Sequence, residues 1–171
     1  MKNIVLTGLR GSGKSKIGKL ISERLKLDFI DLDKEIEKYE GKSIPEIFAK
    51  KGWKYFREIE KKVVKKIAKE KNKIISTGGG TIIYEENYKN LKKNGIIIYL
   101  KRSPADCYKY ISKDKNRPPL TNEKNPLKEI KKIYKERKPF YEKTADIIFK
   151  RSDDVKKDTK KMLKNFIIVK A

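Results

Sequence analysis

A glycine-rich motif near the N-terminus constrains the fold of this chain more than any other feature. Segment Gly8–Ser15 matches the pattern G-x-x-x-x-G-K-[ST], follows a short apolar run and precedes a helical pattern. Glycines in such a loop let successive backbone N–H groups point at phosphate oxygens, and the helix that follows adds its own free N–H groups. We therefore expect a parallel α/β fold that binds a nucleoside triphosphate, with Lys14 on the β- and γ-phosphates and the Ser15 hydroxyl on Mg²⁺.

Short apolar runs alternate with longer amphipathic stretches along the chain. The runs are continuous and rich in β-branched residues, which is typical of parallel strands buried on both faces. Helical patterns lie between them over residues 14–26 and 53–70, and the second places Trp53 and Phe56 on one apolar stripe. The alternation predicts a three-layer α/β fold, with a five-stranded parallel sheet flanked by helices in a single domain over residues 1–171. The predicted strands cover residues 4–6, 27–30, 73–77, 96–100 and 147–149.

Two helix starts have clear sequence signatures. Ser43 and Glu46 have the spacing of a capping box. Ser103 followed by Pro104 is typical of an N-cap and a first helical residue. We expect one helix to begin after each serine.

Composition excludes several classes of protein and of site. The chain has no histidine and one cysteine, which excludes Ser-His-Asp catalysis, an internal disulfide and a zinc site built from the usual ligands. It lacks an apolar run of about 18 residues and the pattern of a signal peptide, so we expect a cytoplasmic protein with no membrane partner. Catalysis would have to rely on carboxylates, lysine, arginine, backbone amides and a bound metal.

Lysine dominates the charge of the chain. Lys and Arg total 46 against 23 Asp and Glu, which gives a formal net charge of +23. A lysine-rich surface is commonly a solvated one, and the alternative is a surface that binds nucleic acid. The lysines are spread over every predicted helix, and aromatic residues do not interleave with arginines as a base-stacking surface requires. We therefore expect no specific nucleic-acid partner.

Two aspartates follow the second predicted strand. Asp31 and Asp33 alternate on an extended segment, so we expect both carboxylates to face the same side, at the strand end beside the phosphate loop. One would hold the Mg²⁺ shell, and the other would orient or deprotonate an attacking hydroxyl. The alternative is that Asp33 only caps a helix that starts at Lys34.

Two later signals also have a functional and a structural interpretation. Arg57 and Glu60 are three residues apart on a predicted helix and can pair, either in a site or as an ordinary surface ion pair. Residues Gly78–Gly80 directly follow the third predicted strand. Three glycines there would let the backbone approach a ligand closely, and the alternative is a flexible turn.

A polar stretch over about residues 112–125 carries three prolines and separates two helical patterns. Structureless segments of this length in a compact domain are often functional. We expect a mobile lid that carries Arg117 over the site, and the alternative is an ordinary surface loop.

Taken together, these motifs resemble the shikimate kinases, small P-loop kinases of the nucleoside monophosphate kinase type. The resemblance covers nearly the whole chain in order: Gly8–Ser15, Asp31-x-Asp33, Ser43–Phe48, Phe56-Arg57-x-x-Glu60, Gly78–Gly80, Asn116-Arg117-Pro118, and Tyr134-x-x-Arg137 with Tyr141. It implies Mg²⁺-dependent transfer of the γ-phosphoryl group of ATP to the 3-hydroxyl of shikimate, giving shikimate 3-phosphate for aromatic amino acid (chorismate) biosynthesis.

The resemblance also implies a role for each site residue. Asp33 would bind and deprotonate the hydroxyl, Lys14 and Arg117 would neutralise the transferring phosphoryl group, and Ser15 and Asp31 would hold Mg²⁺. The region over about residues 31–62 would bind the acceptor, and we expect a monomer. Implied ATP-binding residues are Gly11, Ser12, Gly13, Lys14, Ser15, Lys16, Arg117 and Arg151. Implied shikimate-binding residues are Asp33, Arg57, Glu60, Gly78, Gly79, Gly80 and Arg137.

Three positions depart from the family pattern. Pro119 stands where a leucine commonly follows the first lid proline, Tyr110 stands where the family often has an arginine near adenine, and Arg151 begins an altered adenine loop. These departures leave the contacts to the base open. The alternatives to a shikimate kinase are another P-loop small-molecule kinase, such as a gluconate or nucleoside monophosphate kinase, and a nucleic-acid-binding protein with a nucleotide switch.

Overall fold

The computed structural model describes the backbone of residues 1–112 and 120–170 and the side chains of these ranges up to residue 164. Strands and helices alternate along the chain, as the apolar runs predict. The elements are β1 (Asn3–Thr7), α1 (Lys14–Leu25), β2 (Asp28–Asp31), α2 (Leu32–Glu40), α3 (Ile44–Ile67), β3 (Lys73–Ser76), the 3₁₀ helix η1 (Thr81–Ile83), α4 (Glu85–Asn94), β4 (Gly95–Lys101), α5 (Pro104–Ile111), α6 (Pro126–Thr144), β5 (Ile147–Lys150) and α7 (Val155–Lys170).

Within the described ranges the strands form one five-stranded sheet in the order β2-β3-β1-β4-β5. Every neighbouring pair is parallel, and β1 at the centre pairs with both β3 and β4. Each of the five predicted strands is present, and no strand end differs from its prediction by more than one residue. The predicted five-stranded parallel α/β fold is therefore confirmed, and it brings the carboxyl ends of β1, β2 and β3 to one edge of the sheet.

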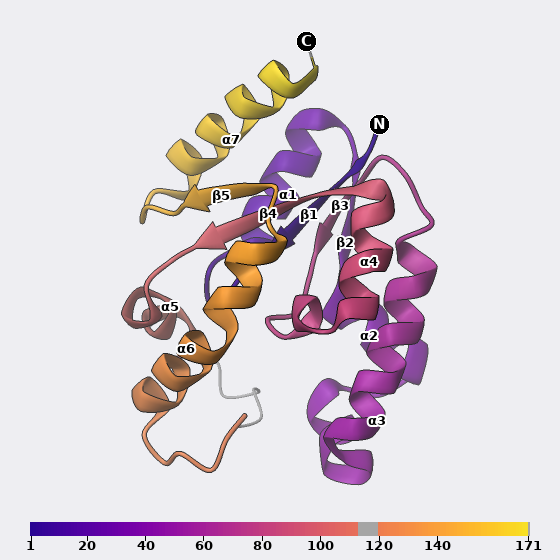
Figure 1. Ribbon diagram of the computed structural model, residues 1–171, viewed down its shortest axis with the longest axis vertical. Helices are drawn as coiled ribbons and strands as arrows, with labels where there is room; N and C mark the ends of the chain where they lie inside the picture. The colour runs from indigo at the N-terminus through magenta and orange to yellow at the C-terminus, as the bar shows by residue number, and fades with distance from the viewer. Residues whose placement is uncertain (113–119, 171) are drawn as a thin grey trace.

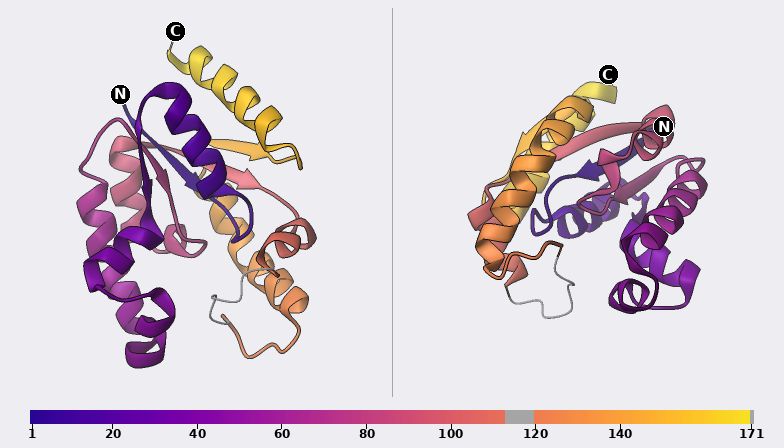
Figure 2. Two further views of the ribbon diagram at one scale, coloured as in Figure 1. Left: turned by 180° about the vertical axis from the view of Figure 1, so that it is seen from behind. Right: turned by 60° about the horizontal axis from the view of Figure 1, so that its bottom comes forward.

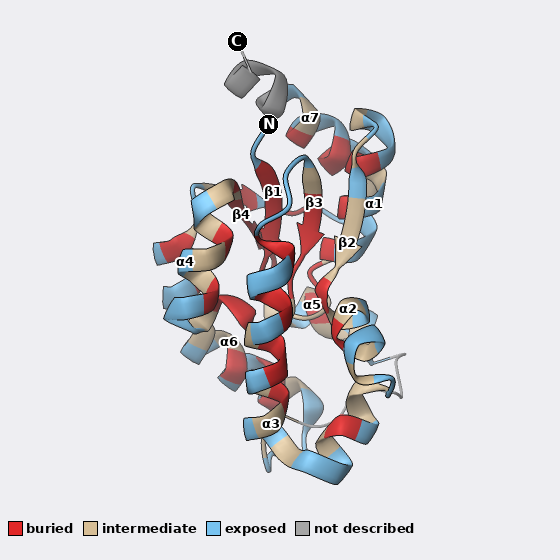
Figure 3. Ribbon diagram, turned by 90° about the vertical axis from the view of Figure 1, so that its right-hand side faces the viewer, coloured by how far each residue is buried: buried red, intermediate tan, exposed pale blue. Residues whose placement is uncertain are grey.

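Helices cover both faces of the sheet and make the fold three-layered (Figure 1). Because successive residues of a strand point to opposite faces, Val5 packs with α3 and α4 while Ile4 and Leu6 pack with α1 on the other face. Figure 2 shows α1 and α7 lying over that second face. The buried strands lie between the two helical layers (Figure 3).

The helix starts at Ser43, Ser103 and Asp31 are capped as their sequences favour. The Ser43 side chain accepts from the backbone N–H of Glu46 while the Glu46 carboxylate accepts from the backbone N–H of Ser43, so the predicted capping box is complete. The Ser103 hydroxyl accepts from the Asp106 backbone ahead of Pro104, as predicted. Asp31 caps α2 by accepting from the backbone N–H of Asp33.

Helix α3 joins the helix expected after Ser43 to the one predicted over residues 53–70. It runs from Ile44 to Ile67, and it is broken at Gly52, where φ is 73° and ψ is −178°. This region of backbone space is open essentially to glycine alone. The break turns Trp53 away from the core, so that it is 38% exposed while Phe56 is buried. The predicted apolar stripe is therefore wrong at Trp53.

No helix in the described part of the chain is long and apolar enough to cross a membrane.

Candidate active site

The phosphate loop lies between β1 and α1, and its glycines have the backbone conformations that the motif requires. Gly11 and Gly13 have φ values of 81° and 86°. A Cβ atom at Gly11 would lie 2.4 Å from the Cys107 carbonyl oxygen, so close packing as well as conformation favours glycine there. Lys14 is buried, and its Nζ donates to the carbonyl oxygens of Gly8 and Leu9 at 2.9 Å and 3.0 Å. These two hydrogen bonds hold the Lys14 side chain along the phosphate loop.

A hydroxyl and a carboxylate meet at the N-terminus of α1. Ser15 Oγ donates to Asp31 Oδ2 at 2.7 Å and lies 3.2 Å from Ser76 Oγ. Oxygen ligands of this kind, completed by phosphate oxygens and water, are what Mg²⁺ prefers. The described residues contain no cluster of three or more His, Cys, Asp or Glu side chains that would form a metal site alone. The arrangement therefore fits a metal shared with a nucleotide.

Asp33 reaches the site by a different route from the predicted one. Strand β2 ends at Asp31, and Asp33 lies in the first turn of α2, not on an extended segment. The alternative that Asp33 caps a helix from Lys34 is also wrong, because the cap is Asp31. Both carboxylates nevertheless line the same two cavities, which meet at Asp31 and Asp33.

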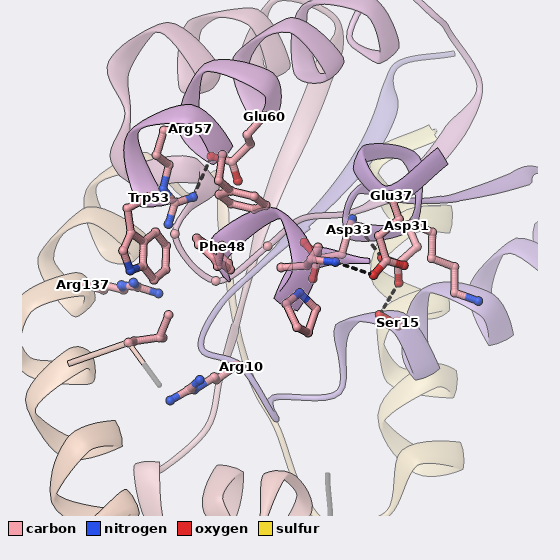
Figure 4. Close-up of a pocket in the computed structure, with 18 residues that line it drawn as sticks. Arg10, Ser15, Asp31, Asp33, Glu37, Phe48, Trp53, Arg57, Glu60 and Arg137 are labelled. Carbon is pink, nitrogen blue, oxygen red and sulfur yellow. Dashed lines mark hydrogen bonds and ion pairs between the residues drawn. The ribbon is translucent and has the colours of Figure 1, made fainter. Parts of the chain in front are cut away.

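The larger cavity, of about 590 Å³, lies between the phosphate loop, α2, α3 and α6. Figure 4 shows Arg57 and Trp53 from α3, Asp33 from α2 and Arg137 from α6 around it. Phe48 and Trp53, on either side of the Gly52 break, pack together with ring centroids 4.2 Å apart and ring planes tilted by 51°. The residues that line the larger cavity are Arg10, Ser15, Asp31, Asp33, Lys34, Glu37, Ile44, Pro45, Phe48, Trp53, Phe56, Arg57, Glu60, Gly78, Gly79, Gly80, Leu120 and Arg137.

Arg57 is fixed by a buried carboxylate. Its Nη1 donates to Glu60 Oε2 at 2.7 Å, and Glu60 is only 1% exposed. Glu60 Oε1 accepts from Thr81 Oγ1 at 2.7 Å, which ties α3 to η1. The guanidinium carbon lies 5.1 Å from the centroid of the Trp53 ring, within cation–π range. The alternative of an ordinary surface ion pair is therefore wrong for Arg57 and Glu60.

The three glycines after β3 pass directly between the charged groups of the site. A Cβ atom at Gly80 would lie 2.6 Å from Arg57 Nη2, and one at Gly78 would lie 3.1 Å from Asp33 Oδ1. The Tyr141 hydroxyl donates to the Gly79 carbonyl oxygen at 2.5 Å. The segment is thus closely packed at Gly78 and Gly80 and hydrogen-bonded at Gly79, and it is not a loose turn.

The smaller cavity, of about 220 Å³, lies along the phosphate loop. Its lining includes Arg102, Tyr110, Arg151 and Val155. The Arg102 guanidinium lies 4.4 Å from the centroid of the Tyr110 ring and is paired with Asp153. Tyr110 therefore has a cationic partner although no arginine stands at its own position.

Arg151 is buried, as are Ser12 and Lys14 among the predicted nucleotide-binding residues. Its Nε donates to Asp158 Oδ2 at 2.8 Å and its Nη1 donates to the Ser12 carbonyl oxygen at 2.9 Å. Both side chains of the ion pair are at most 2% exposed. Arg151 thus supports the phosphate loop from behind, and a contact to the nucleotide stays a prediction.

Apart from Ser12, every predicted site residue that the structure describes lines one or both cavities. Arg117 and Pro119 lie outside the described residues. Sequence reasoning missed several lining residues, among them Arg10, Arg102 and Phe48. The partners of Arg10 and Arg102 are Glu129 and Asp153, 119 and 51 residues away in sequence, so no local pattern marks these arginines. Phe48 follows the capping box and could have been found as a second aromatic near Trp53.

The chain matches known proteins over most of its length. The family model described as shikimate kinase matches residues 10–167. A shikimate kinase of Caldanaerobacter subterraneus subsp. tengcongensis is 45% identical over 91% of this chain and 92% of its own length. One from Clostridium botulinum (strain 657 / Type Ba4) is 49% identical over 86% of this chain and 87% of its own.

The fold has a close counterpart among solved structures. The structure of a shikimate kinase from Acinetobacter baumannii in complex with shikimate superimposes with a TM-score of 0.94 and 33% identity, covering 99% of this chain and 95% of that one. Since the family model spans most of the chain and the relatives match over most of their length, the chain belongs to the shikimate kinase family and is an ATP-dependent phosphotransferase with shikimate kinase activity.

Proposed function

We propose that the two cavities form one active site, with ATP in the smaller, shikimate in the larger, and Asp33 at their junction. The observation that carries the proposal is that Asp31, Asp33, Gly78 and Gly79 line both cavities. A γ-phosphoryl group on the phosphate loop and a hydroxyl in the larger cavity would therefore meet beside the two aspartates. This is the positioning that phosphoryl transfer requires.

Arg57 and Arg137 are proposed to clamp the shikimate carboxylate. Both line the larger cavity, and a planar guanidinium matches the geometry of a carboxylate. Arg57 Nε is buried with no hydrogen-bond partner among the described residues. Glu60 holds the other end of Arg57, and the backbone of Gly79 and Gly80 offers N–H groups to the same ligand.

The phosphate loop is proposed to hold ATP with Mg²⁺. Gly11 through Lys16 would bind the phosphates, with Lys14 on the transferring group. Ser15 and Asp31 would hold the metal, Ser15 directly and Asp31 through its water shell. Bound there, Mg²⁺ would neutralise charge on the β- and γ-phosphates.

The chemical step assigns the proton to Asp33. The 3-hydroxyl oxygen of shikimate attacks the γ-phosphorus, a new P–O bond forms, and the bond from the γ-phosphorus to the bridging oxygen of ADP breaks. The hydroxyl proton passes to the Asp33 carboxylate. All the proposed groups come from one chain, which supports a monomer as the catalytic unit.

Replacing Asp33 by asparagine tests the proposal. Asp33→Asn keeps the size of the side chain and removes the base, so kcat should fall by about 10²–10⁴-fold while ATP binding stays nearly intact. Glu35→Gln is the matched control, because Glu35 lies in the same first turn of α2 but lines neither cavity. Wild-type turnover in Asp33→Asn, measured by ADP release, would remove Asp33 from the mechanism.

A further inference from the structure

Glu129 on α6 is a buried carboxylate that the proposed mechanism does not use. It is 5% exposed. One of its oxygens, Oε2, accepts from Arg10 Nη2 at 2.7 Å. The other, Oε1, accepts from the backbone N–H groups of Leu120 and Thr121 at 2.7 Å and 2.8 Å and from the Thr121 hydroxyl at 3.3 Å. A single side chain thus joins two segments that are far apart in the sequence.

Those two segments belong to the two halves of the site. Arg10 is part of the phosphate loop and lines both cavities. Leu120 lines the larger cavity, where the acceptor would bind. Figure 4 shows Arg10 and Arg57 on opposite sides of that cavity. Glu129 therefore connects the phosphate loop to a wall of the acceptor cavity.

Only a carboxylate satisfies this arrangement of donors. All the groups around Glu129 are donors, and an ionised carboxylate offers acceptors on both oxygens. Glutamine would present an NH₂ group either to the Arg10 guanidinium or to the two backbone N–H groups. Either orientation places donor against donor in a buried site, which weakens one of the two connections.

We propose that Arg10 and Glu129 are positioning residues for the acceptor: the pair holds Leu120 against the phosphate loop and so sets the wall that shikimate contacts. The inference rests on the proposed place of shikimate in the larger cavity. It assigns to an arginine of the phosphate loop a task on the acceptor side, separate from phosphate binding. Loss of the pair then weakens shikimate binding and leaves ATP binding largely intact.

The test compares the Michaelis constants of variants of the full chain. Glu129→Gln and Arg10→Met should each raise the KM for shikimate about tenfold, the factor that corresponds to about 1.4 kcal/mol. The KM for ATP and kcat should change by no more than about twofold. The double variant should be no worse than either single one, because both remove the same pair. Arg10→Lys keeps a charged donor for one oxygen and should recover part of the loss.

Two controls separate the inference from a general loss of structure. Glu142 is another carboxylate on α6 that pairs with a cation, because its Oε1 accepts from Lys101 Nζ at 2.9 Å. It lines neither of the two cavities, so Glu142→Gln should leave both KM values unchanged. Trp53 is the single tryptophan of the chain and lines the larger cavity, so its fluorescence reports shikimate binding at equilibrium. In Glu129→Gln and Arg10→Met, the Kd for shikimate measured by fluorescence should rise together with the KM for shikimate.

Several results would overturn the inference. An unchanged shikimate KM in Glu129→Gln, or equal rises in both KM values, would show that the pair does not position the acceptor. Arg57→Ala distinguishes this from failure of the proposed function. If Arg57→Ala raises the shikimate KM and Glu129→Gln does not, only the present inference fails. If neither variant changes it, the assignment of the larger cavity to shikimate fails as well.

Discussion

Arg151 Nη1 donates to the carbonyl oxygen of Ser12 at 2.9 Å, so the segment after the last strand supports the phosphate loop directly. The same guanidinium binds Asp158 of α7, which also accepts from the Ser152 backbone at 2.9 Å. The C-terminal helix is thereby connected to the nucleotide site through one buried cation. A substitution that breaks this ion pair should lower the melting temperature and weaken nucleotide binding.

Replacing Arg151 by methionine removes the cation and leaves Asp158 buried without it. Breaking a buried ion pair from one side costs about 3 kcal/mol or more. For a chain of this size the melting temperature should fall by on the order of 10 °C. The KM for ATP should rise more than the KM for shikimate, because only the phosphate loop loses a support. Equal rises, measured by coupled assay, would mean that the loop does not depend on Arg151.

A methyl group added at two neighbouring glycines should have unequal effects. At Gly80 a Cβ would meet Arg57 Nη2 at 2.6 Å, whereas at Gly79 its nearest neighbours lie at 3.4 Å. Gly80→Ala should therefore displace the guanidinium and raise the shikimate KM by at least tenfold. Gly79→Ala is the control and should change it by only a few fold. The reverse order in steady-state kinetics would contradict the placement of Arg57.

We expect Tyr141 to affect shikimate binding by holding Gly79, whose carbonyl oxygen accepts from the Tyr141 hydroxyl. Burial raises the pKa of Tyr141 to about 12, so the hydroxyl stays protonated and remains a donor at neutral pH. Tyr141→Phe removes this hydrogen bond, worth about 1 kcal/mol, and keeps the stack on Tyr99, whose centroid lies 5.1 Å away. The shikimate KM should rise a few fold with little change in melting temperature. A large loss of stability instead would make the residue structural.

Cys107 should make stability depend on alkaline pH. It is fully buried, and burial raises the pKa of its thiol to about 11, above the roughly 8.5 of an unfolded cysteine. A raised folded pKa means that this contribution to stability is complete below about pH 8.5 and is lost as pH rises toward 11. By pH 10 the loss should reach about 2 kcal/mol. Urea unfolding of the wild type and Cys107→Ala at pH 7.5 and 10 measures it, and an equal decline in both proteins would exclude the thiol as the cause.

Sequence patterns predicted the sheet and most of the site because their signals are local. The phosphate loop, the capping box at Ser43 and the pair Arg57 and Glu60 are each contained within a few residues. Asp33 was placed wrongly on an extended segment because the switch from β2 to α2 occurs at Asp31 without an intervening loop. Trp53 was assigned to the core because its spacing fits a continuous helix, and periodicity alone does not reveal the break at Gly52.

The remaining site residues depend on contacts that only the folded chain creates. Arg10 and Arg102 find their carboxylates on distant elements, α6 and the segment after β5. In the sequence each is one basic residue among 46, with nothing to separate it from solvated lysines. Burial and partner identity, which the fold supplies, are what distinguish them.

The shape of the larger cavity depends on the break at Gly52. The bend in α3 brings the rings of Phe48 and Trp53 together. In a straight helix, side chains five positions apart would not lie on the same face. With φ at 73° and ψ at −178°, any side chain at this position would oppose the bend even though open space surrounds it. The aromatic wall can therefore vary by ordinary substitution, while its shape depends on a residue that has no side chain at all.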